Sequence, residues 1–211
     1  MNKSAFFSSV MLAGALSAAP AFAETKTYAL ADFTRISASA GVDVDVTAGS
    51  DYSVVATSSA EGLERLEIKV AAGELQIRRK ANGWRWKRGD DVNVKVSLPA
   101  LEAVDVSSGA SVDAVGVDAG AFAIDASSGG SLDIVGRCDA LTVDVSSGGS
   151  VDADGLQCRT ANASASSGGS ADIFASESVN AEASSGGSVD VSGAPKSVNK
   201  DTSSGGSVDV D

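Results

Sequence analysis

A five-residue segment recurs through the second half of the chain at almost constant intervals. Ser-Ser-Gly-Ala-Ser begins at position 107, and Ser-Ser-Gly-Gly-Ser begins at positions 127, 146, 166, 184 and 203, so the interval is 18 to 20 residues. A flexible Gly/Ser linker has a similar composition, but here apolar residues alternate with polar ones on both sides of the copies. The repeat therefore predicts an ordered solenoid, in which each copy is one structural unit.

Alignment of the copies on their first serine separates apolar columns from polar ones. Alternation with a period of two is typical of strands that bury one face. The apolar column after the glycines contains Val112, Leu132, Val151, Ala171, Val189 and Val208. The next column, which is expected to face water, contains Asp113, Asp133, Asp152, Asp172, Asp190 and Asp209. Each repeat is therefore predicted to be two short strands around a Ser-Gly corner, followed by a less regular return.

This unit matches one coil of a parallel β-helix, in which neighbouring coils lie about 4.8 Å apart. Coils of about 19 residues are expected over residues 99–211. The preceding residues, 24–98, are predicted to form a strand-rich layer, and the two parts together one folded all-β unit. Strand patterns bounded by turn signals occupy residues 33–39, 42–47, 52–57, 66–71, 75–80 and 92–98.

The first 23 residues have the pattern of a secretory signal peptide. Lys3 precedes a short apolar stretch, and Ala21-Phe22-Ala23 supplies the small residues of a cleavage site before Glu24. We expect residues 1–23 to be removed and the chain to be exported to the periplasm or the extracellular medium. No later stretch approaches the roughly 20 apolar residues of a membrane span, so no transmembrane segment is expected.

Several short motifs of the first half occur in a fixed order before the repeat. They are Phe33-Thr-Arg-Ile36, Gly41-Val-Asp-Val-Asp-Val46, Gly49-Ser-Asp-Tyr52, Gly73-Glu-Leu-Gln-Ile77 and Val94-Lys-Val-Ser-Leu-Pro99. Together with the Gly/Ser repeat, this order resembles the family called putative autotransporter adhesin, head GIN domain, a secreted bacterial domain of unknown function. The resemblance extends over residues 33–211 and implies a right-handed parallel β-helix preceded by a strand-rich layer. It implies no established activity.

The two cysteines, Cys138 and Cys158, each lie eight residues before the next repeat. They are therefore expected in one column of neighbouring coils, with Ala119 and Ser176 in that column in the adjoining coils. Strands about 4.8 Å apart bring Cα atoms within the range of a disulfide, and exported proteins meet an oxidising environment. We predict a Cys138–Cys158 disulfide, with two reduced, buried cysteines as the alternative.

The outward aspartate column places like charges about 5 Å apart, which is unfavourable. Bound divalent cations, retained protons or solvent screening would each relieve the repulsion. Carboxylate oxygens suit Ca²⁺, but the Gly-Gly-Ser-Val-Asp pattern lacks the spacing and the third glycine of the calcium-binding nonapeptide repeat. A solvated acidic face is therefore the simpler interpretation, and no other cofactor is expected. The candidate calcium ligands are Asp113, Asp133, Asp152, Asp172, Asp190 and Asp209.

Basic and aromatic residues are concentrated at positions 78–88. This segment contains six of the 15 basic residues that follow the signal peptide, and both tryptophans of the chain. A basic tip that carries Trp suits contact with an anionic polysaccharide, lipid head groups or a nucleic acid. The alternative is a hairpin that packs back against the acidic solenoid. The candidate contact residues are Trp84, Arg85, Trp86, Lys87 and Arg88.

Composition limits the function of the chain. It has no His, which removes Ser-His and Cys-His nucleophile pairs and most zinc sites. Residues 99–211 contain 17 acidic and 4 basic residues, whereas residues 24–98 contain 11 of each, so no nucleic-acid partner is expected.

We expect a non-enzymatic binding or adhesion module whose partner is unknown, such as a cell-envelope or polysaccharide surface. The alternatives are a calcium-binding structural solenoid and a polysaccharide-active enzyme that uses Asp152 and Asp154.

The last coil of a solenoid exposes a free strand edge, which invites pairing with another chain. Lys200 stands in a column that is apolar in the other repeats, and Pro195 precedes it. An inward charge and a proline are both ways of blocking a strand edge, and fraying of the last coil is the alternative interpretation. Self-association through the coil ends is therefore a further possibility.

Overall fold

The computed structural model describes residues 23–80 and 91–211. The predicted signal peptide, apart from Ala23, and the candidate contact residues 84–88 lie outside the described residues. Within the described ranges the chain forms strands almost throughout, with one short helix.

The strands are short in the N-terminal layer, residues 24–98, and long only in the middle of the repeat coils, from residue 111 to residue 183. In chain order the elements are β1 (Glu24–Tyr28), β2 (Arg35–Ser39), β3 (Asp43–Ala48), β4 (Ser53–Ser58), α1 (Ala60–Arg65), β5 (Leu66–Ala71), β6 (Glu74–Arg79), β7 (Asn93–Leu98), β8 (Ala103–Ser107), β9 (Ser111–Ser127), β10 (Ser131–Val145), β11 (Ser150–Ala165), β12 (Ser170–Ala183), β13 (Ser188–Ser192), β14 (Ser197–Thr202) and β15 (Ser207–Val210).

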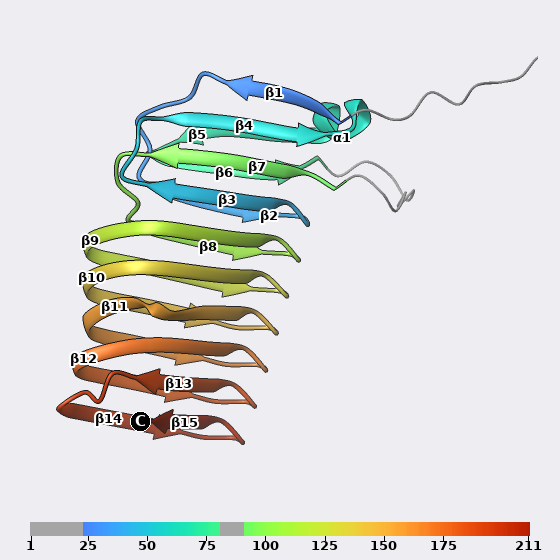
Figure 1. The fold of residues 1–211 in the computed structure, drawn as a ribbon. Coiled ribbons are helices and arrows are strands. Elements are labelled where there is room, and N and C mark those ends of the chain that lie inside the picture. The colour runs from blue at the N-terminus through green and yellow to red at the C-terminus, as the bar shows by residue number, and fades with distance from the viewer. Residues whose placement is uncertain (1–22, 81–90) are drawn as a thin grey trace, which may run out of the picture.

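These strands form one sheet that winds into a solenoid (Figure 1). One side has the order β1-β4-β7-β3-β9-β10-β11-β12-β13-β15. On the other side, β5-β6-β2-β8 leads to the second halves of β9 to β12 and then to β14. Pairing between the repeat coils is parallel, and Asp133 lies opposite Asp152, one repeat further along the chain. The predicted parallel β-helix is confirmed.

Antiparallel pairs occur only in the N-terminal layer among the strands that the structure describes. They join β1 to β4, β4 to β7, and β5 to β6. The strands of this layer continue the two sides of the repeat coils, because β3 pairs with β9 and β2 pairs with β8. The predicted strand-rich layer is therefore the first part of the same continuous sheet.

Each repeated Ser-Gly segment forms a tight corner. In one of them, the Gly130 amide donates to the Ser127 carbonyl at 2.9 Å, and the two central residues, Ser128 and Gly129, have φ angles of 52° and 74°. A turn with two left-handed residues favours glycine. Gly130 has a different role, because a Cβ atom there would lie 2.5 Å from the Val106 carbonyl oxygen of the preceding coil. Turn geometry and coil stacking together therefore determine the corner sequence.

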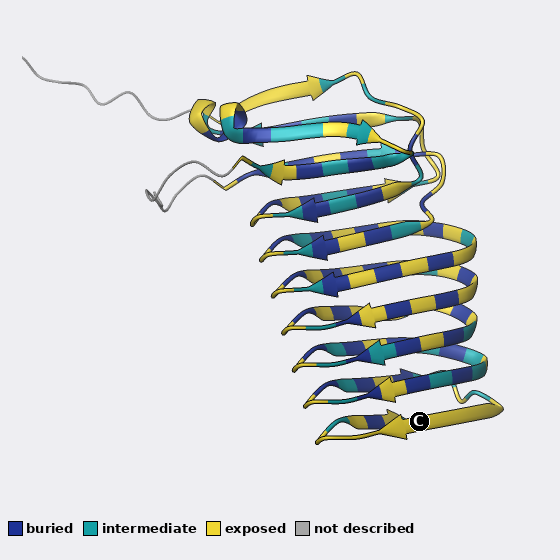
Figure 2. Ribbon diagram, turned by 180° about the vertical axis from the view of Figure 1, so that it is seen from behind, coloured by how far each residue is buried: buried dark blue, intermediate teal, exposed yellow. Residues whose placement is uncertain are grey.

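Alternate residues of the strands inside the stack fill the interior (Figure 2), whereas the outer strands β1 and β14 bury none of their residues. The N-terminal layer buries large side chains, including Phe33, Leu75 and Ile77. The rings of Phe33 and Tyr52 pack with their centroids 5.0 Å apart. The later coils bury mainly small side chains, such as Ala163 and Ala181. The side chains that fill the interior therefore become smaller towards the later coils, where the repeat is more regular.

The six strands expected in the N-terminal layer are all present, with ends that differ by at most two residues. β1 and α1 were missed. The helix begins after Ser59, whose Oγ accepts a hydrogen bond from the Gly62 amide at 3.0 Å, which is the arrangement of an N-cap. With six residues it falls far short of a membrane span, as does every helix in the described ranges.

The returns within β9 to β12 are more regular than expected, whereas residues 193–196 form a non-strand return between β13 and β14. β9 and β10 run from one corner to the next, and their pairing shifts register before Gly136 and then continues. Gly116 and Gly136 have φ angles of 80° and 154°. A bulge of this kind bends a strand without ending it, so the coil closes by bending a paired strand and not by an irregular loop.

Candidate functional site

The six aspartates expected to face water form one continuous ladder. Each pairs in register with the next along the coils, and their side chains lie on the exposed face. The structure adds a seventh rung, Asp45 in β3, which lies opposite Asp113. Beyond it, Lys95 in β7 lies opposite Asp45, and the Asn93 side-chain amide donates to Asp45 Oδ2 at 3.1 Å. The carboxylate ladder therefore ends at a lysine and an amide in the N-terminal layer.

Asp45 was missed although the sequence contained a signal for it. Ser39-Ala40-Gly41 is followed by Val44 and Asp45 at the same offsets at which Ser107-Ser108-Gly109 is followed by Val112 and Asp113. Ala40 and Gly41 have φ angles of 64° and 66°, so this segment is a corner like the others. A search for corners without the second glycine would have identified the extra rung.

Several carboxyls of the ladder have a raised pKa, first because they are partly desolvated and then because carboxylates stand beside them. The pKa of Asp113 is raised by burial and then by the negative charges of Asp133 and Asp45. The pKa of Asp172 is raised by burial and then by Asp190 and Asp152. Each charged rung therefore disfavours the ionisation of the next, as expected for carboxylates at strand spacing.

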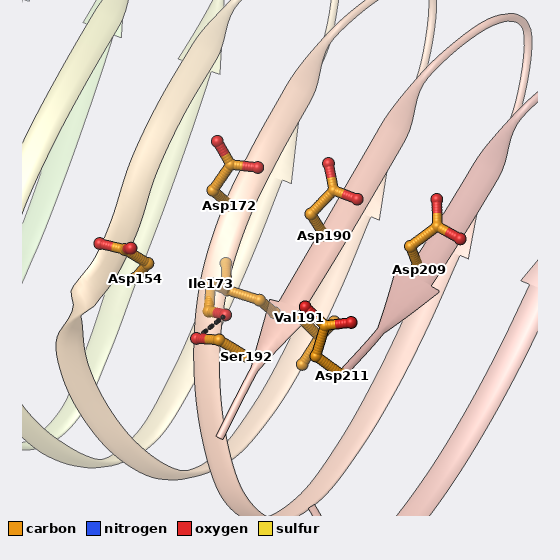
Figure 3. A pocket seen from close by; sticks show the side chains of 8 residues that line it. All are labelled: Asp154, Asp172, Ile173, Asp190, Val191, Ser192, Asp209 and Asp211. Carbon is orange, nitrogen blue, oxygen red and sulfur yellow. Dashed lines mark hydrogen bonds between the residues drawn. The ribbon is translucent and has the colours of Figure 1, made fainter. Parts of the chain in front are cut away.

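Near the C-terminal end the ladder borders a shallow groove of about 200 Å³ (Figure 3). Asp172, Asp190 and Asp209 stand in a row on successive coils, and Asp154 and Asp211 lie along one side. The floor includes Ile173 and Ser192, and the hydroxyl of Ser192 donates to the carbonyl of Ile173 at 3.2 Å. The groove is therefore an open acidic surface and not an enclosed pocket.

No group of three or more acidic or cysteine side chains in the described ranges is arranged to hold a metal ion. A calcium site needs six to eight oxygen ligands around one point, whereas the ladder places its carboxylates in single file. Calcium binding by Asp113, Asp133, Asp152, Asp172, Asp190 and Asp209 stays an untested alternative to the solvated acidic face.

Two arginines of the repeat coils form ion pairs away from the ladder. Arg137 makes a two-bond contact with Asp118, with Nε 3.0 Å from Oδ1. The Arg159 guanidinium donates two hydrogen bonds of 3.0 and 3.2 Å to the Glu177 carboxylate. Its Nη1 atom also lies 3.8 Å from Asp139 Oδ1. Hydrogen bonding to Arg137 lowers the pKa of the Asp118 carboxyl. These pairs join neighbouring coils, and Asp118, Arg137 and Arg159 line a second groove of about 560 Å³.

The floor of this second groove contains the predicted disulfide, which is confirmed. Cys138 and Cys158 are bonded across neighbouring coils, with their Cα atoms 4.5 Å apart. Ala119 lies opposite Cys138 as expected. The residue opposite Cys158 is Ala175 and not Ser176, because the register shifts at this point in β12. The disulfide therefore joins β10 to β11 within the bend of the coil.

The residues that flank the candidate contact segment are held at the N-terminal end of the solenoid. The Lys80 amide donates to the Arg65 carbonyl at 2.8 Å, and the Ser58 hydroxyl donates to the Asp91 carbonyl at 2.8 Å. Both contacts lie beside α1, at the opposite end of the molecule from β14 and β15 (Figure 1). Trp84, Arg85, Trp86, Lys87 and Arg88 themselves lie outside the described residues.

Two solved structures with the same architecture are putative adhesins from Bacteroides fragilis and Parabacteroides distasonis. A putative adhesin from Bacteroides fragilis is similar with a TM-score of 0.69 and 16% identity, and the match covers 90% of this chain and 97% of that one. A putative adhesin from Parabacteroides distasonis has a TM-score of 0.50 and 18% identity, with 91% and 98% covered. At these identities the likeness establishes the fold alone. No curated protein matches the chain.

The sequence also matches a family model. The match covers residues 32–195, from the segment before β2 to the end of the return that follows β13. It therefore includes the N-terminal layer from β2 onward, the disulfide and five of the six repeated corners. The chain belongs to the family described as putative auto-transporter adhesin, head GIN domain.

Proposed function

We propose that this chain is an exported, non-enzymatic binding module of the adhesion type. In this proposal the repeat coils are a rigid spacer, and the basic segment 84–88 is the contact surface at the N-terminal end. The observation that carries the proposal is the acidic ladder on the coils, together with the position of the residues that flank the basic segment. Seven carboxylates follow the solenoid from Asp45 to Asp209, whereas the anchors of the basic segment lie beside α1.

Such a charge distribution would orient the molecule at a surface. An anionic envelope polymer repels the acidic coils and attracts the basic end, so that the molecule approaches with the N-terminal layer first. Tryptophan rings then add contact area at low conformational cost. The ion pairs and the disulfide between coils support the role of a stiff spacer, because they resist separation of the stack.

The described surface offers less support for catalysis. General acid and base pairs need two groups whose environments push their pKa values apart. Along the ladder, Asp113, Asp152 and Asp172 instead share one direction of pKa shift and similar causes. Asp152 and Asp154 lie on the same open face, and Asp154 borders only the shallow groove.

The test measures binding of the exported chain to polygalacturonate, an anionic polysaccharide, with vesicles of an anionic phospholipid as the second probe. We expect a Trp84→Ala/Trp86→Ala variant to lose about tenfold or more in affinity for the polysaccharide, as buried aromatic contacts at binding sites commonly do. The matched control, Trp84→Phe/Trp86→Phe, keeps the rings and should retain most of the affinity.

Two results would oppose the proposal. Binding that is unchanged in the alanine variant but lost on neutralising the ladder would place the contact on the coils. Turnover of the polysaccharide that disappears in an Asp152→Asn variant would make the chain a polysaccharide-active enzyme.

A further inference from the structure

Among the strands that the structure describes, four have one free edge. β1 and β5 are the outer strands at the N-terminal end, and β14 and β15 are the outer strands at the C-terminal end (Figure 1). Edge strands present backbone groups that can pair with another chain. A regular β-helix is especially prone to this, because a second copy offers strands with matching alternation and spacing.

One interior column can be followed through the paired residues along the first side of the solenoid. All of its rungs are valine, leucine or alanine except the first, which is a lysine. From the N-terminal to the C-terminal end the column contains Lys26, Ala56, Val94, Val44, Val112, Leu132, Val151, Ala171, Val189 and Val208.

The corresponding column on the other side has its lysine at the opposite end. From the N-terminal to the C-terminal end it contains Val70, Leu75, Ile36, Val104, Ile124, Val143, Ala163, Ala181 and Lys200. Each end of the solenoid therefore presents one lysine and one valine in register with the core. Lys26 is in the middle of β1, and Lys200 is near the middle of β14.

Both lysines lie where they cover the end of the stack without being enclosed. The Lys26 ammonium is 4.9 Å from the centre of the Tyr28 ring, in the geometry of a cation–π contact. The Lys200 ammonium reaches from β14 to β15 and donates to the Val208 carbonyl at 3.3 Å. Val208 is the last rung of the first column, so Lys200 crosses over the open end of the core.

We propose that Lys26 and Lys200 keep copies of this chain from stacking end to end. In a head-to-tail stack, β15 would meet β1 of the next copy, and β14 would meet its β5. Val208 would then lie against Lys26, and Lys200 against Val70, so two ammonium groups would enter apolar columns. Stacking of like ends would place Lys200 against Lys200 or Val208 of the second copy, or Lys26 against its Lys26 or Val70. Every arrangement therefore buries a charge that the column cannot pair, which is strongly unfavourable.

This inference is independent of the proposed binding function. Lys26 and Lys200, at opposite ends of the solenoid, each prevent end-to-end association with another copy. The lysines would keep a chain with nine or ten stacked rungs per column from growing into a fibre.

The experiment compares the size of the wild-type chain with that of a Lys26→Val/Lys200→Val variant by light scattering over a wide range of concentration. We expect a monomer for the wild type at every concentration. The double variant should increase in mass with concentration and form filaments one solenoid wide in electron micrographs. Each single variant lacks the lysine at only one end, so two copies can pair through that end alone. Its mass should therefore not exceed that of a dimer.

Two control variants separate the column position from the loss of charge. Lys95→Val/Lys196→Val removes two exposed lysines that lie outside the two columns, and it should stay monomeric. Lys26→Glu/Lys200→Glu keeps a charge in each column and should stay monomeric as well. If the double valine variant does not fold, the Lys26→Thr/Lys200→Thr variant replaces it.

A folded, monomeric double variant with an unchanged circular dichroism spectrum would overturn the proposal. So would end-to-end association of the wild-type chain, or filaments formed equally by either control.

Discussion

The N-terminal layer and the repeat coils belong to the same sheet, yet they differ in charge, in strand direction and in the size of the side chains that they bury. The layer has balanced charge, pairs strands in both directions and buries large side chains such as Phe33 and Leu75. The repeat coils have 17 acidic and 4 basic residues, pair strands in parallel and bury mainly alanine and valine in the later coils. The repeat coils thus have a core of small side chains, whereas the N-terminal end of the stack is closed by large residues and antiparallel strands.

The corners show the same difference at single positions. In the regular coils the fourth corner residue is a glycine, such as Gly130 or Gly149, that lies against the backbone of the corner before it. Ala110 and Val42 occupy that position in the first two corners and are buried. A side chain is therefore accepted only at the start of the stack, and the glycine pair is a consequence of coil-on-coil packing.

The largest expected effect comes from the disulfide, which exists only in the repeat coils. A Cys138→Ser/Cys158→Ser variant should lose about 3 kcal/mol of unfolding free energy, because the bond closes a loop with a sequence separation of 20. Denaturant unfolding with and without reductant measures this loss. Hydrogen exchange should show that the coils lose protection before the N-terminal layer, and equal loss in both regions would contradict the comparison.

The second prediction concerns two neighbouring glycines. Gly130→Ala should destabilise the fold by about 2 kcal/mol, because its Cβ would meet the Val106 backbone. Gly129→Ala is the control, since nothing lies within 4 Å of a Cβ there and only the left-handed backbone opposes it, at about 1 kcal/mol. Thermal unfolding of both variants shows which substitution causes the larger loss of stability. A larger loss for Gly129→Ala would show that turn geometry, and not stacking, requires the glycine pair.

A smaller effect is expected from the acidic ladder, and it has a defined sign. The pKa of Asp152 is raised by burial and then by Asp154 and Asp133, so its ionised form opposes folding. Asp152→Asn should therefore stabilise the fold at pH 7 by about 0.5 kcal/mol. The difference should disappear as the pH falls through the raised pKa towards the unfolded value of about 3.9, where the wild type becomes protonated.

Asp118→Asn is the matched control for this titration and should act in the opposite direction. Its pKa is lowered by Arg137, so the wild-type contribution exists above the unfolded pKa and is lost as the pH falls through the folded pKa. The variant should be less stable than the wild type at pH 7 and equal to it in acid. Melting temperatures between pH 3 and 8 test both variants, and shifts of the same sign would refute the assignment.

The smallest expected effect is that of calcium. The ladder is a single file of carboxylates, so we expect Ca²⁺ to change the unfolding midpoint by less than about 1 °C relative to chelator at constant ionic strength. A rise of several degrees that vanishes in Asp172→Asn would make the ladder a set of calcium sites. The repeat coils would then be a metal-stiffened solenoid.

Most of the fold was predictable from the sequence because its signals are local and repeated. The period of two gave the direction of the side chains, and the spacing of the corners gave the coil. Cys138 and Cys158 could be paired because they share one position in adjacent repeats. β1 and α1 were missed because single, short elements have no repeat to reinforce them. The contact segment 84–88 rests on composition alone.

The sequence by itself determined the coil, its corners and the faces of its strands, because each depends on residues within one repeat. Only the tertiary structure decided which distant segments lie at the same rung. It placed Asp45 on the ladder, Ala175 opposite Cys158, and Lys26 at the opposite end of the solenoid from Lys200. The physical reason is that rung order is set by strand pairing between segments far apart in the chain, and no local pattern specifies that order.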